Sequence, residues 1–250
     1  MFRPDAAVAA LLEARRSRTQ LAALPEGAKP GSVAEAYAVQ DGVTQALGPV
    51  GAWKIGAKSP SDSPLAAPIQ QSDVLADAAR VPRDRFNIVI VEAEVAFRFG
   101  RDLPAAGSPY DDATILSAIE SAHPAIEIVD SRFADIEKLD PFSKLADFQL
   151  NGALVVGPAL RDWQGMDLKA ITANVTIDGK TMIEKTGGNP AGDPRWLALW
   201  AANNLIARGQ PILAGQVVTT GSYIGMLPAP QGGEIVATLS GVGSVSVRIG

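Results

Sequence analysis

The sequence of 250 residues contains no cysteine and only one histidine, His123. The absence of cysteine excludes disulfides, zinc–thiolate sites, iron–sulfur clusters and a thiol nucleophile. Basic residues are not in excess either, because the formal net charge is -5 at pH 7. A chain with this charge lacks the attraction for phosphates that is typical of nucleic-acid-binding surfaces. We therefore expect no nucleic-acid partner.

Long hydrophobic runs are also missing from the sequence. No segment approaches the ~20 consecutive apolar residues that a helix needs to cross a bilayer. The apolar stretch at residues 6–12 is short, and Arg15 and Arg16 follow it in place of a small-residue cleavage site. This pattern is not typical of a signal peptide. We expect a cytoplasmic protein without a membrane partner.

The residues that are present indicate an ordinary globular protein, with 47% hydrophobic and 20% charged side chains. A chain of this length buries a substantial core without disulfides. Residues 1–50 show helical spacing, and Ser32 with Glu35 forms a capping box at the start of a helix. Residues 51–250 are rich in strand patterns. We expect one α+β domain overall, with an N-terminal helical part (1–50) and a β-rich body (51–250).

Within the body, several segments have a clear pattern. Residues 87–99 alternate as a long strand, 111–122 have helical spacing, and 125–129 form a short strand pattern. The polar segment 131–149 is a candidate lid or active-site loop. Residues 59–68 are rich in serine and proline and predict a loop. Further along, Asp178-Gly179 lies between two strand patterns and is typical of a type I′ hairpin turn.

The strand at 87–99 carries two glutamates that deserve a functional interpretation. Its odd-numbered residues from 89 are all apolar, so Glu92 and Glu94 project together from the opposite face. Two like charges so placed repel each other unless a cation lies between them. Carboxylate oxygens suit hard cations such as magnesium, calcium or manganese. A solvated strand face is the alternative, although Ile88 and Ile90 on the same face indicate partial cover.

A third glutamate, Glu127, has apolar neighbours on both sides of its strand. A carboxylate in such surroundings is costly unless it is paired with a cation. The residues alone leave two partners open, a metal ion or an arginine such as Arg132. Lys54 raises a similar question, because it lies between the small residues Ala52 and Gly56. It could bind a carboxylate or transfer a proton, or it could be a surface lysine.

Four motifs occur in a characteristic order. They are WKIG at 53–56, EAE at 92–94, PAIEIVDSR at 124–132 and TGS at 220–222. With these motifs the chain resembles the 2-keto-4-pentenoate hydratase / 4-oxalocrotonate decarboxylase family, within the fumarylacetoacetate hydrolase superfamily. The resemblance covers nearly the whole chain.

The resemblance implies a mixed β-roll body with an N-terminal helical part. It implies that Glu92, Glu94 and Glu127 bind Mg²⁺ or Mn²⁺, and that Lys54 and Asp130 lie beside the substrate as catalytic residues. Members of this family are commonly homo-oligomers, so we expect one here.

Three further residues are predicted to contact the substrate. Arg132 lies in the third motif, and Thr220 and Ser222 flank Gly221 at the end of a strand. The two hydroxyls could donate hydrogen bonds to the substrate. Turn formation is the alternative role for them.

The expected activity is that of a divalent-metal-dependent hydratase acting on a 2-hydroxy-dienoate or 2-oxo-alkenoate such as 2-keto-4-pentenoate. A decarboxylase of the 4-oxalocrotonate type and a C–C bond hydrolase or acylpyruvase are the enzymatic alternatives. His123 precedes a proline at the start of a strand, which favours a structural role and disfavours a hydrolase with a histidine base. Where the family often carries an aspartate, residues 68–71 have none. A non-enzymatic protein that binds a 2-oxo acid with a metal therefore also remains an alternative.

Overall fold

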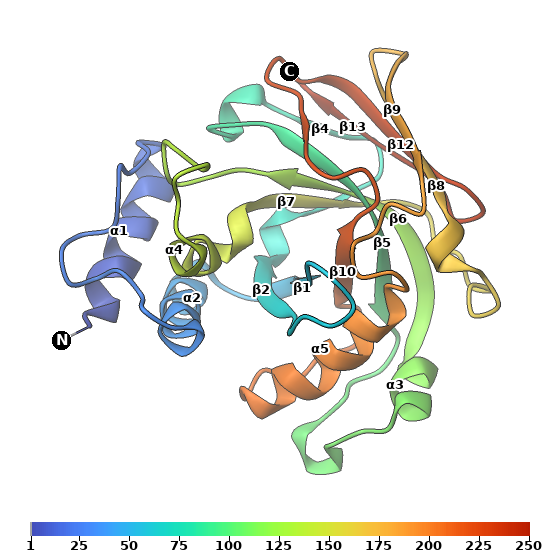
Figure 1. Cartoon of the computed structure of the whole chain (residues 1–250), viewed down its shortest axis with the longest axis horizontal. Coiled ribbons are helices and arrows are strands. Elements are labelled where there is room, and N and C mark those ends of the chain that lie inside the picture. The colour runs from blue at the N-terminus through green and yellow to red at the C-terminus, as the bar shows by residue number, and fades with distance from the viewer. Residues whose placement is uncertain (1) are drawn as a thin grey trace.

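The computed structural model describes residues 2–250 and has two β-sheets flanked by helices (Figure 1). The larger sheet has the spatial order β2-β1-β10-β5-β6-β7-β3, and β11 pairs with β5. Its strands are β1 (Val50–Gly56), β2 (Leu65–Gln70), β3 (Val74–Ala76), β5 (Ile90–Phe99), β6 (Ile119–Val129), β7 (Asn151–Val156), β10 (Val217–Ser222) and β11 (Leu227–Pro228). The sheet is mixed, because β1 runs parallel to β10 and β3 parallel to β7, while β5 is antiparallel to its neighbours.

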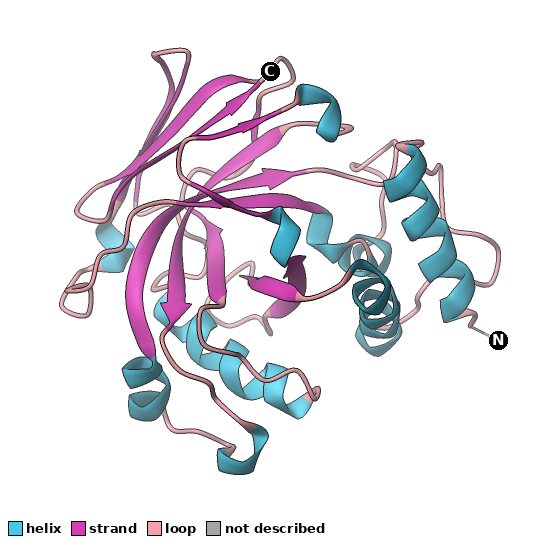
Figure 2. Cartoon of the chain, turned by 180° about the vertical axis from the view of Figure 1, so that it is seen from behind, coloured by secondary structure: helices cyan, strands magenta, loops and turns pink. Residues whose placement is uncertain are grey.

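The smaller sheet has the order β4-β13-β12-β8-β9 and packs over the larger one (Figures 1 and 2). Its strands are β4 (Ala79–Val81), β8 (Thr172–Ile177), β9 (Lys180–Thr186), β12 (Gly233–Leu239) and β13 (Gly243–Ile249). The hairpin between β8 and β9 is confirmed, since Asp178 and Gly179 have φ values of 48° and 77°, as a type I′ turn requires. Apolar residues of both sheets share one continuous core, which includes Ala93, Val175 and Ile235.

The helices are α1 (Pro4–Ser17), α2 (Val33–Leu47), α3 (Asp112–Ala118), α4 (Pro141–Ala146) and α5 (Arg195–Ala207). The N-terminal helices pack with α4 at one side of the sheet around a second core that includes Leu11, Val39 and Phe148 (Figure 1). Ser32 caps α2 by accepting a hydrogen bond from the backbone N–H of Glu35 at 3.2 Å. Within residues 2–250, none of the helices is both long and apolar enough to cross a membrane.

The α+β architecture predicted from the sequence is confirmed, while some element limits were wrong. The helix expected at 111–122 ends at Ala118, because Ser121 and Ala122 pair with β5 and extend β6 to 11 residues. The loop expected at 59–68 ends earlier, since Leu65 begins β2. The segment 131–149 contains α4, which packs on α2. The division of the chain at residue 50 stays a prediction.

Candidate metal centre and active-site cleft

Three glutamates converge on one face of the larger sheet. Glu92 on β5 lies directly opposite Glu127 on β6, and Glu94 follows two residues along β5 on the same face. One carboxylate oxygen from each residue lies within 4.8 Å of the others. Glu94 and Glu127 are fully buried. The expected alternation of β5 is confirmed, because Ala93 on its other face lies in the core between the sheets.

Lys54 provides the counter-charge of this cluster. Its Nζ donates to Glu127 Oε1 at 2.7 Å and to Glu92 Oε2 at 3.4 Å, and also to the backbone oxygen of Gln149 at 3.3 Å. Of the two partners left open for Glu127, an arginine such as Arg132 is therefore not the one it contacts, and the alternative of an exposed surface lysine is wrong for Lys54. Burial alone would lower the pKa of Lys54. The charges of the three glutamates raise it above its ordinary value instead, so the ammonium group stays protonated.

A β-bulge in β10 completes the surroundings of Glu94. Thr219 pairs with Ala96 and Ser222 with Glu94, so three residue steps on β10 oppose two on β5. Gly221, with a φ of 86°, donates its backbone N–H to Glu94 Oε2 at 2.9 Å. The Thr219 hydroxyl donates to the same oxygen. The bulge thus directs two donors at one carboxylate oxygen.

The bulge also sets the positions of Thr220 and Ser222, whose hydroxyls were predicted to contact the substrate. Thr220 is fully buried and donates to the backbone oxygen of Val95 at 2.6 Å. The structure therefore does not bring Thr220 to the glutamates. Ser222 lines the cleft beside Glu94, where its hydroxyl donates to the backbone oxygen of Gly225 at 2.8 Å.

The charge balance of the cluster favours a bound cation. Asn151 Nδ2 donates to Glu127 Oε1 at 3.0 Å, yet Glu127 Oε2 and Glu94 Oε1 are buried without a hydrogen-bond partner among residues 2–250. Burial and the neighbouring carboxylates raise the pKa of Glu94 to about 8. Burial, opposed by Lys54, raises the pKa of Glu127 to about 7. Unpaired buried oxygens are costly, so this donor set fits a hard divalent cation.

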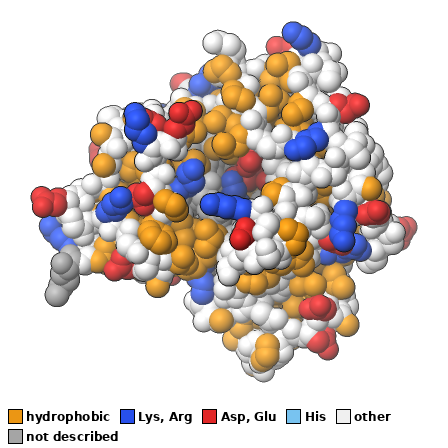
Figure 3. Space-filling model, viewed as in Figure 1, with side chains coloured by type: hydrophobic (Ala, Val, Ile, Leu, Met, Phe, Trp, Pro, Cys, Tyr) orange, Lys and Arg blue, Asp and Glu red, His pale blue; other side chains and the backbone are white. Residues whose placement is uncertain are grey.

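Two hollows meet at the glutamates. One, of about 370 Å³, is lined by Glu92 and Glu94 together with Lys185 and Ser222. The other, of about 590 Å³, extends past Glu92 toward α4 and is lined partly by Lys58, Lys144, Leu145, Gln149 and Met226. Figure 3 shows a hollowed area on this face where positive and negative side chains gather. Lysines around an acidic centre are suited to an anionic ligand that reaches a bound cation.

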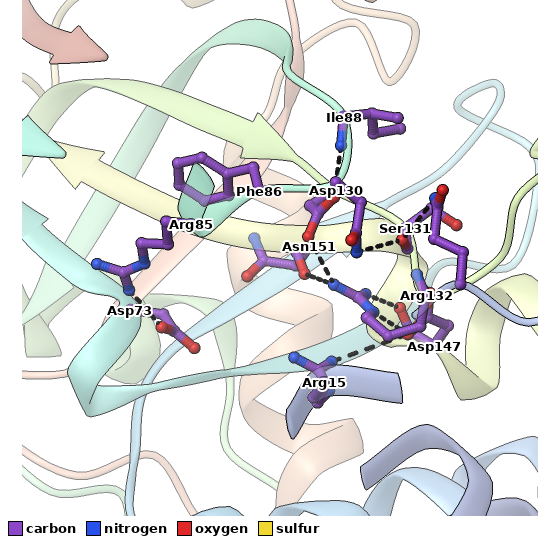
Figure 4. Close-up of polar contacts among 12 residues, drawn as sticks. Arg15, Asp73, Arg85, Phe86, Ile88, Asp130, Ser131, Arg132, Asp147 and Asn151 are labelled. Carbon is purple, nitrogen blue, oxygen red and sulfur yellow. Dashed lines mark hydrogen bonds and ion pairs between the residues drawn. The ribbon is translucent and has the colours of Figure 1, made fainter. Parts of the chain in front are cut away.

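The structure does not bring Asp130 and Arg132, which were predicted to lie beside the substrate, to the three glutamates. Successive residues of a strand point to opposite faces, so Asp130 projects away from the face of Glu127. Its Oδ1 accepts the backbone N–H of Ile88 at 3.0 Å. The guanidinium of Arg132 is buried and donates to Asp147, including its backbone oxygen at 2.9 Å (Figure 4). Both residues line a separate pocket.

The structural role predicted for the single histidine agrees with its contacts. His123 is buried, with Nε2 at 2.9 Å from the Ser121 hydroxyl and Nδ1 at 2.8 Å from the backbone oxygen of Gly157. Burial lowers the pKa of His123. The segment 68–71, where the family often has an aspartate, is followed by Asp73. This acid pairs with Arg85 at 2.6 Å and lies outside the cleft.

The segment 146–151 contributes two contacts to the site, of which Gln149 lies in the candidate active-site loop 131–149 and Asn151, just beyond it, was not predicted. Asn151 contacts Glu127 through its amide, and the backbone of Gln149 contacts Lys54. Gln149 has a φ of 51°, in the left-handed region. Its own amide donates to the backbone oxygen of Leu65 at 3.1 Å. A polar residue held in this conformation at a cleft is typical of functional sites, but the backbone angle is not visible in the sequence.

Comparison with known proteins adds independent observations. The fumarylacetoacetate (FAA) hydrolase C-terminal family matches residues 38–250. A 2-keto-4-pentenoate hydratase from Paraburkholderia phymatum is 31% identical over 97% of this chain and 96% of its own. A 2-hydroxyhexa-2,4-dienoate hydratase from Comamonas testosteroni is 32% identical over 63% of this chain and 58% of its own. The solved 4-oxalocrotonate decarboxylase from Pseudomonas putida G7, complexed with magnesium and adipate, has a TM-score of 0.85 and 22% identity, with 100% and 99% of the two chains covered. This last likeness shows a shared fold.

Proposed function

Because the chain belongs to the fumarylacetoacetate hydrolase C-terminal family, we propose that it is a divalent-metal-dependent lyase that hydrates a small 2-hydroxy-dienoate. A suitable substrate is 2-hydroxypenta-2,4-dienoate, the dienol form of 2-keto-4-pentenoate. The observation that carries the proposal is the cluster of Glu92, Glu94 and Glu127, in which two buried carboxylate oxygens have no partner among residues 2–250. The full-length similarity to a 2-keto-4-pentenoate hydratase supports the same activity.

Glu92, Glu94 and Glu127 would hold the cation, which we propose to be Mg²⁺ or Mn²⁺. Such an ion, when bound, supplies Lewis-acid stabilisation of the negative charge that develops on the 2-oxo oxygen of the substrate. The donors to Glu94 from Thr219 and Gly221 fix the orientation of its carboxylate. Groups that orient a ligand in this way raise metal affinity and preserve the geometry of the site.

Lys54 is the residue that we assign to the substrate carboxylate and to proton transfer. Its ammonium group stays protonated, so it acts as a hydrogen-bond donor and an acid, not as a base, in the ground state. The hydration moves one proton to a carbon of the dienol and adds the elements of water across the remaining alkene. Leu145 and Met226 line the larger hollow and would contact the hydrocarbon part of the substrate.

A decarboxylase of the 4-oxalocrotonate type is the second candidate. The observation that favours it is the presence of Lys58 and Lys144 in the outer part of the larger hollow, where they would pair with the second carboxylate of a dicarboxylic substrate. Product analysis separates the two activities. A hydratase gives the water adduct from 2-hydroxypenta-2,4-dienoate, whereas a decarboxylase releases carbon dioxide from a 2-oxo dicarboxylate.

The substitution Glu94→Gln tests the metal centre. We expect the wild type to consume the absorbance of the dienol in Mg²⁺ and to stop in EDTA, and the variant to be inactive while it remains folded. Glu120→Gln is a matched control, because Glu120 is an exposed glutamate on β6, and it should retain activity. If Glu94→Gln binds Mn²⁺ as tightly as the wild type, the ligand assignment is wrong. Metal-dependent binding of 2-oxo acids without turnover would favour the non-enzymatic alternative.

A further inference from the structure

A pocket separate from the two hollows of the metal cleft lies on the side of β6 away from the glutamates. Four arginines and two aspartates contribute to its lining, and its volume is about 110 Å³. These residues are Arg15, Arg18, Arg85, Arg132, Asp73 and Asp130. Figure 4 shows Arg15, Arg85 and Arg132 with the two aspartates. We propose that this arginine pocket binds a small oxoanion, either inorganic phosphate or the carboxylate of a small organic acid. The proposal does not rest on the hydratase activity, because none of these residues lines the metal cleft.

The aspartates of the arginine pocket are already engaged. Asp73 forms an ion pair with Arg85 at 2.6 Å. Asp130 accepts a backbone N–H and lies 3.8 Å from Arg132 Nη1. Four arginines and two aspartates leave an excess of two positive charges, and counting the buried carboxylate of Asp147 behind the pocket reduces this excess to one. A monoanion or dianion would therefore be attracted to the pocket, and a cation would be repelled.

Arg15 is the residue that most lacks a partner. Its Nε and Nη2 atoms are buried and have no hydrogen-bond partner among residues 2–250. The closest acid is Asp147, whose Oδ1 lies 3.8 Å from Nη2 and already accepts from Arg132. The guanidinium of Arg15 lies 4.7 Å above the ring of Phe148, which fixes its plane. The Arg15 side chain is 18% exposed, and the nearest carboxylate oxygen among residues 2–250 lies 3.8 Å from its guanidinium, so an oxoanion in the pocket would supply a closer counter-charge than the protein does.

Burial and the charge of Arg132 lower the pKa of Arg15 to about 10, so it still carries its charge at neutral pH. A planar guanidinium offers parallel donors to two oxygens of a phosphate or a carboxylate. The volume of the pocket corresponds to roughly three or four water molecules at about 30 Å³ each. This space accommodates a single phosphate or carboxylate group and is too small to enclose a whole nucleotide. Since Arg15 and Arg18 come from the end of α1, the anion would link this helix to the sheet.

Calorimetric titration of the EDTA-treated protein tests the proposal. Inorganic phosphate and acetate are titrated separately, with chloride used to hold the ionic strength constant. We expect saturable binding of one anion per chain, and the anion with the lower Kd identifies the chemical class. Glu94→Gln should bind that anion as the wild type does, which distinguishes the arginine pocket from the metal centre.

Variants of the pocket give the discriminating result. Arg15→Gln should weaken binding about tenfold or more, because a charge-assisted hydrogen bond is lost. Arg15→Lys keeps the charge but not the planar pair of donors, so it should also bind the anion more weakly. This variant provides the test if Arg15→Gln fails to fold. Arg16→Gln is the control, since Arg16 is on the same helix but pairs with Glu13 at 2.7 Å. The proposal fails if the wild type binds neither anion saturably, or if both Arg15 variants bind as tightly as the wild type.

Discussion

Replacement of Lys54 by methionine should affect the stability of the metal-free protein more than that of the metal-bound protein. In the metal-free protein the Lys54 ammonium neutralises Glu92 and Glu127 at 3.4 and 2.7 Å. Methionine fills a similar volume but has no charge, so the carboxylates lose their counter-ion. A divalent cation bound between the glutamates would replace that lost charge. We therefore expect Lys54→Met to be strongly destabilising in EDTA and much less so in excess Mg²⁺ or Mn²⁺.

The magnitude follows from the burial of the pair. Removing one partner of a buried ion pair costs about 3–5 kcal/mol. Partial protonation of Glu94 and Glu127, whose pKa values are raised, brings the expected loss near pH 8 to the lower end, about 3 kcal/mol. For a chain of this size each kcal/mol changes Tm by about 2–4 °C, so Tm in EDTA should fall by about 6–12 °C. A cation at one hundred times its Kd adds about 2.7 kcal/mol of stability.

Thermal unfolding followed by circular dichroism, with and without the cation, measures both values. The increase in Tm on adding the cation should be larger for Lys54→Met than for the wild type. Lys180→Met is the control, because Lys180 is exposed at the β8–β9 hairpin, and it should change Tm little in either buffer. An equal fall in Tm in EDTA and in Mg²⁺ would refute the assignment of Lys54 as the counter-charge of the metal centre.

Two further predictions concern pH and the arginine that the sequence placed at the substrate. The folded-state pKa values of Glu94 and Glu127, about 8 and about 7, lie above their ordinary value of 4.5, so the folded metal-free protein binds more protons than the unfolded chain over this range. Its stability should therefore fall as the pH rises from about 5 to about 8, with a smaller fall in Mg²⁺; a flat Tm profile in EDTA would contradict this. Arg132→Gln leaves Asp147 buried without its partner, so it should lower stability by about 3–5 kcal/mol in denaturant titrations. A raised KM with unchanged stability would instead support the substrate-binding role of Arg132.

The sequence predicted features that depend on local periodicity. Alternation along one strand places Glu92 and Glu94 on a common face, and this needs no knowledge of the neighbouring strands. The family predicted from the four motifs is also confirmed, because it rests on spacing along the whole chain. The pairing of Glu127 with Lys54 was not predictable in this way. It depends on the order of β1, β10, β5 and β6 in the sheet.

Asp130 and Thr220, which the structure does not bring to the glutamates, show where local patterns and family resemblance lead to different expectations. Glu127 and Asp130 are three positions apart, so strand alternation alone sets them on opposite faces, whereas the resemblance put both at the substrate. Regular alternation would likewise put Thr220 and Ser222 on one face. The extra residue in β10 exchanges Thr220 for Thr219. Gly221, whose φ of 86° suits a bulge, is the sequence signal that could have indicated it. The homo-oligomer and the cytoplasmic location stay predictions.

Asn151 links the metal cleft and the arginine pocket, which lie on opposite sides of β6, through two hydrogen bonds. The backbone oxygen of Asn151 accepts a hydrogen bond from Arg132 Nη1 at 3.0 Å, while its side-chain amide donates to Glu127 at 3.0 Å. Asn151 begins β7 beside β6, so its position depends on the buried pair of Arg132 with Asp147. Arg132 therefore belongs to the frame of hydrogen bonds that holds Asn151 against Glu127.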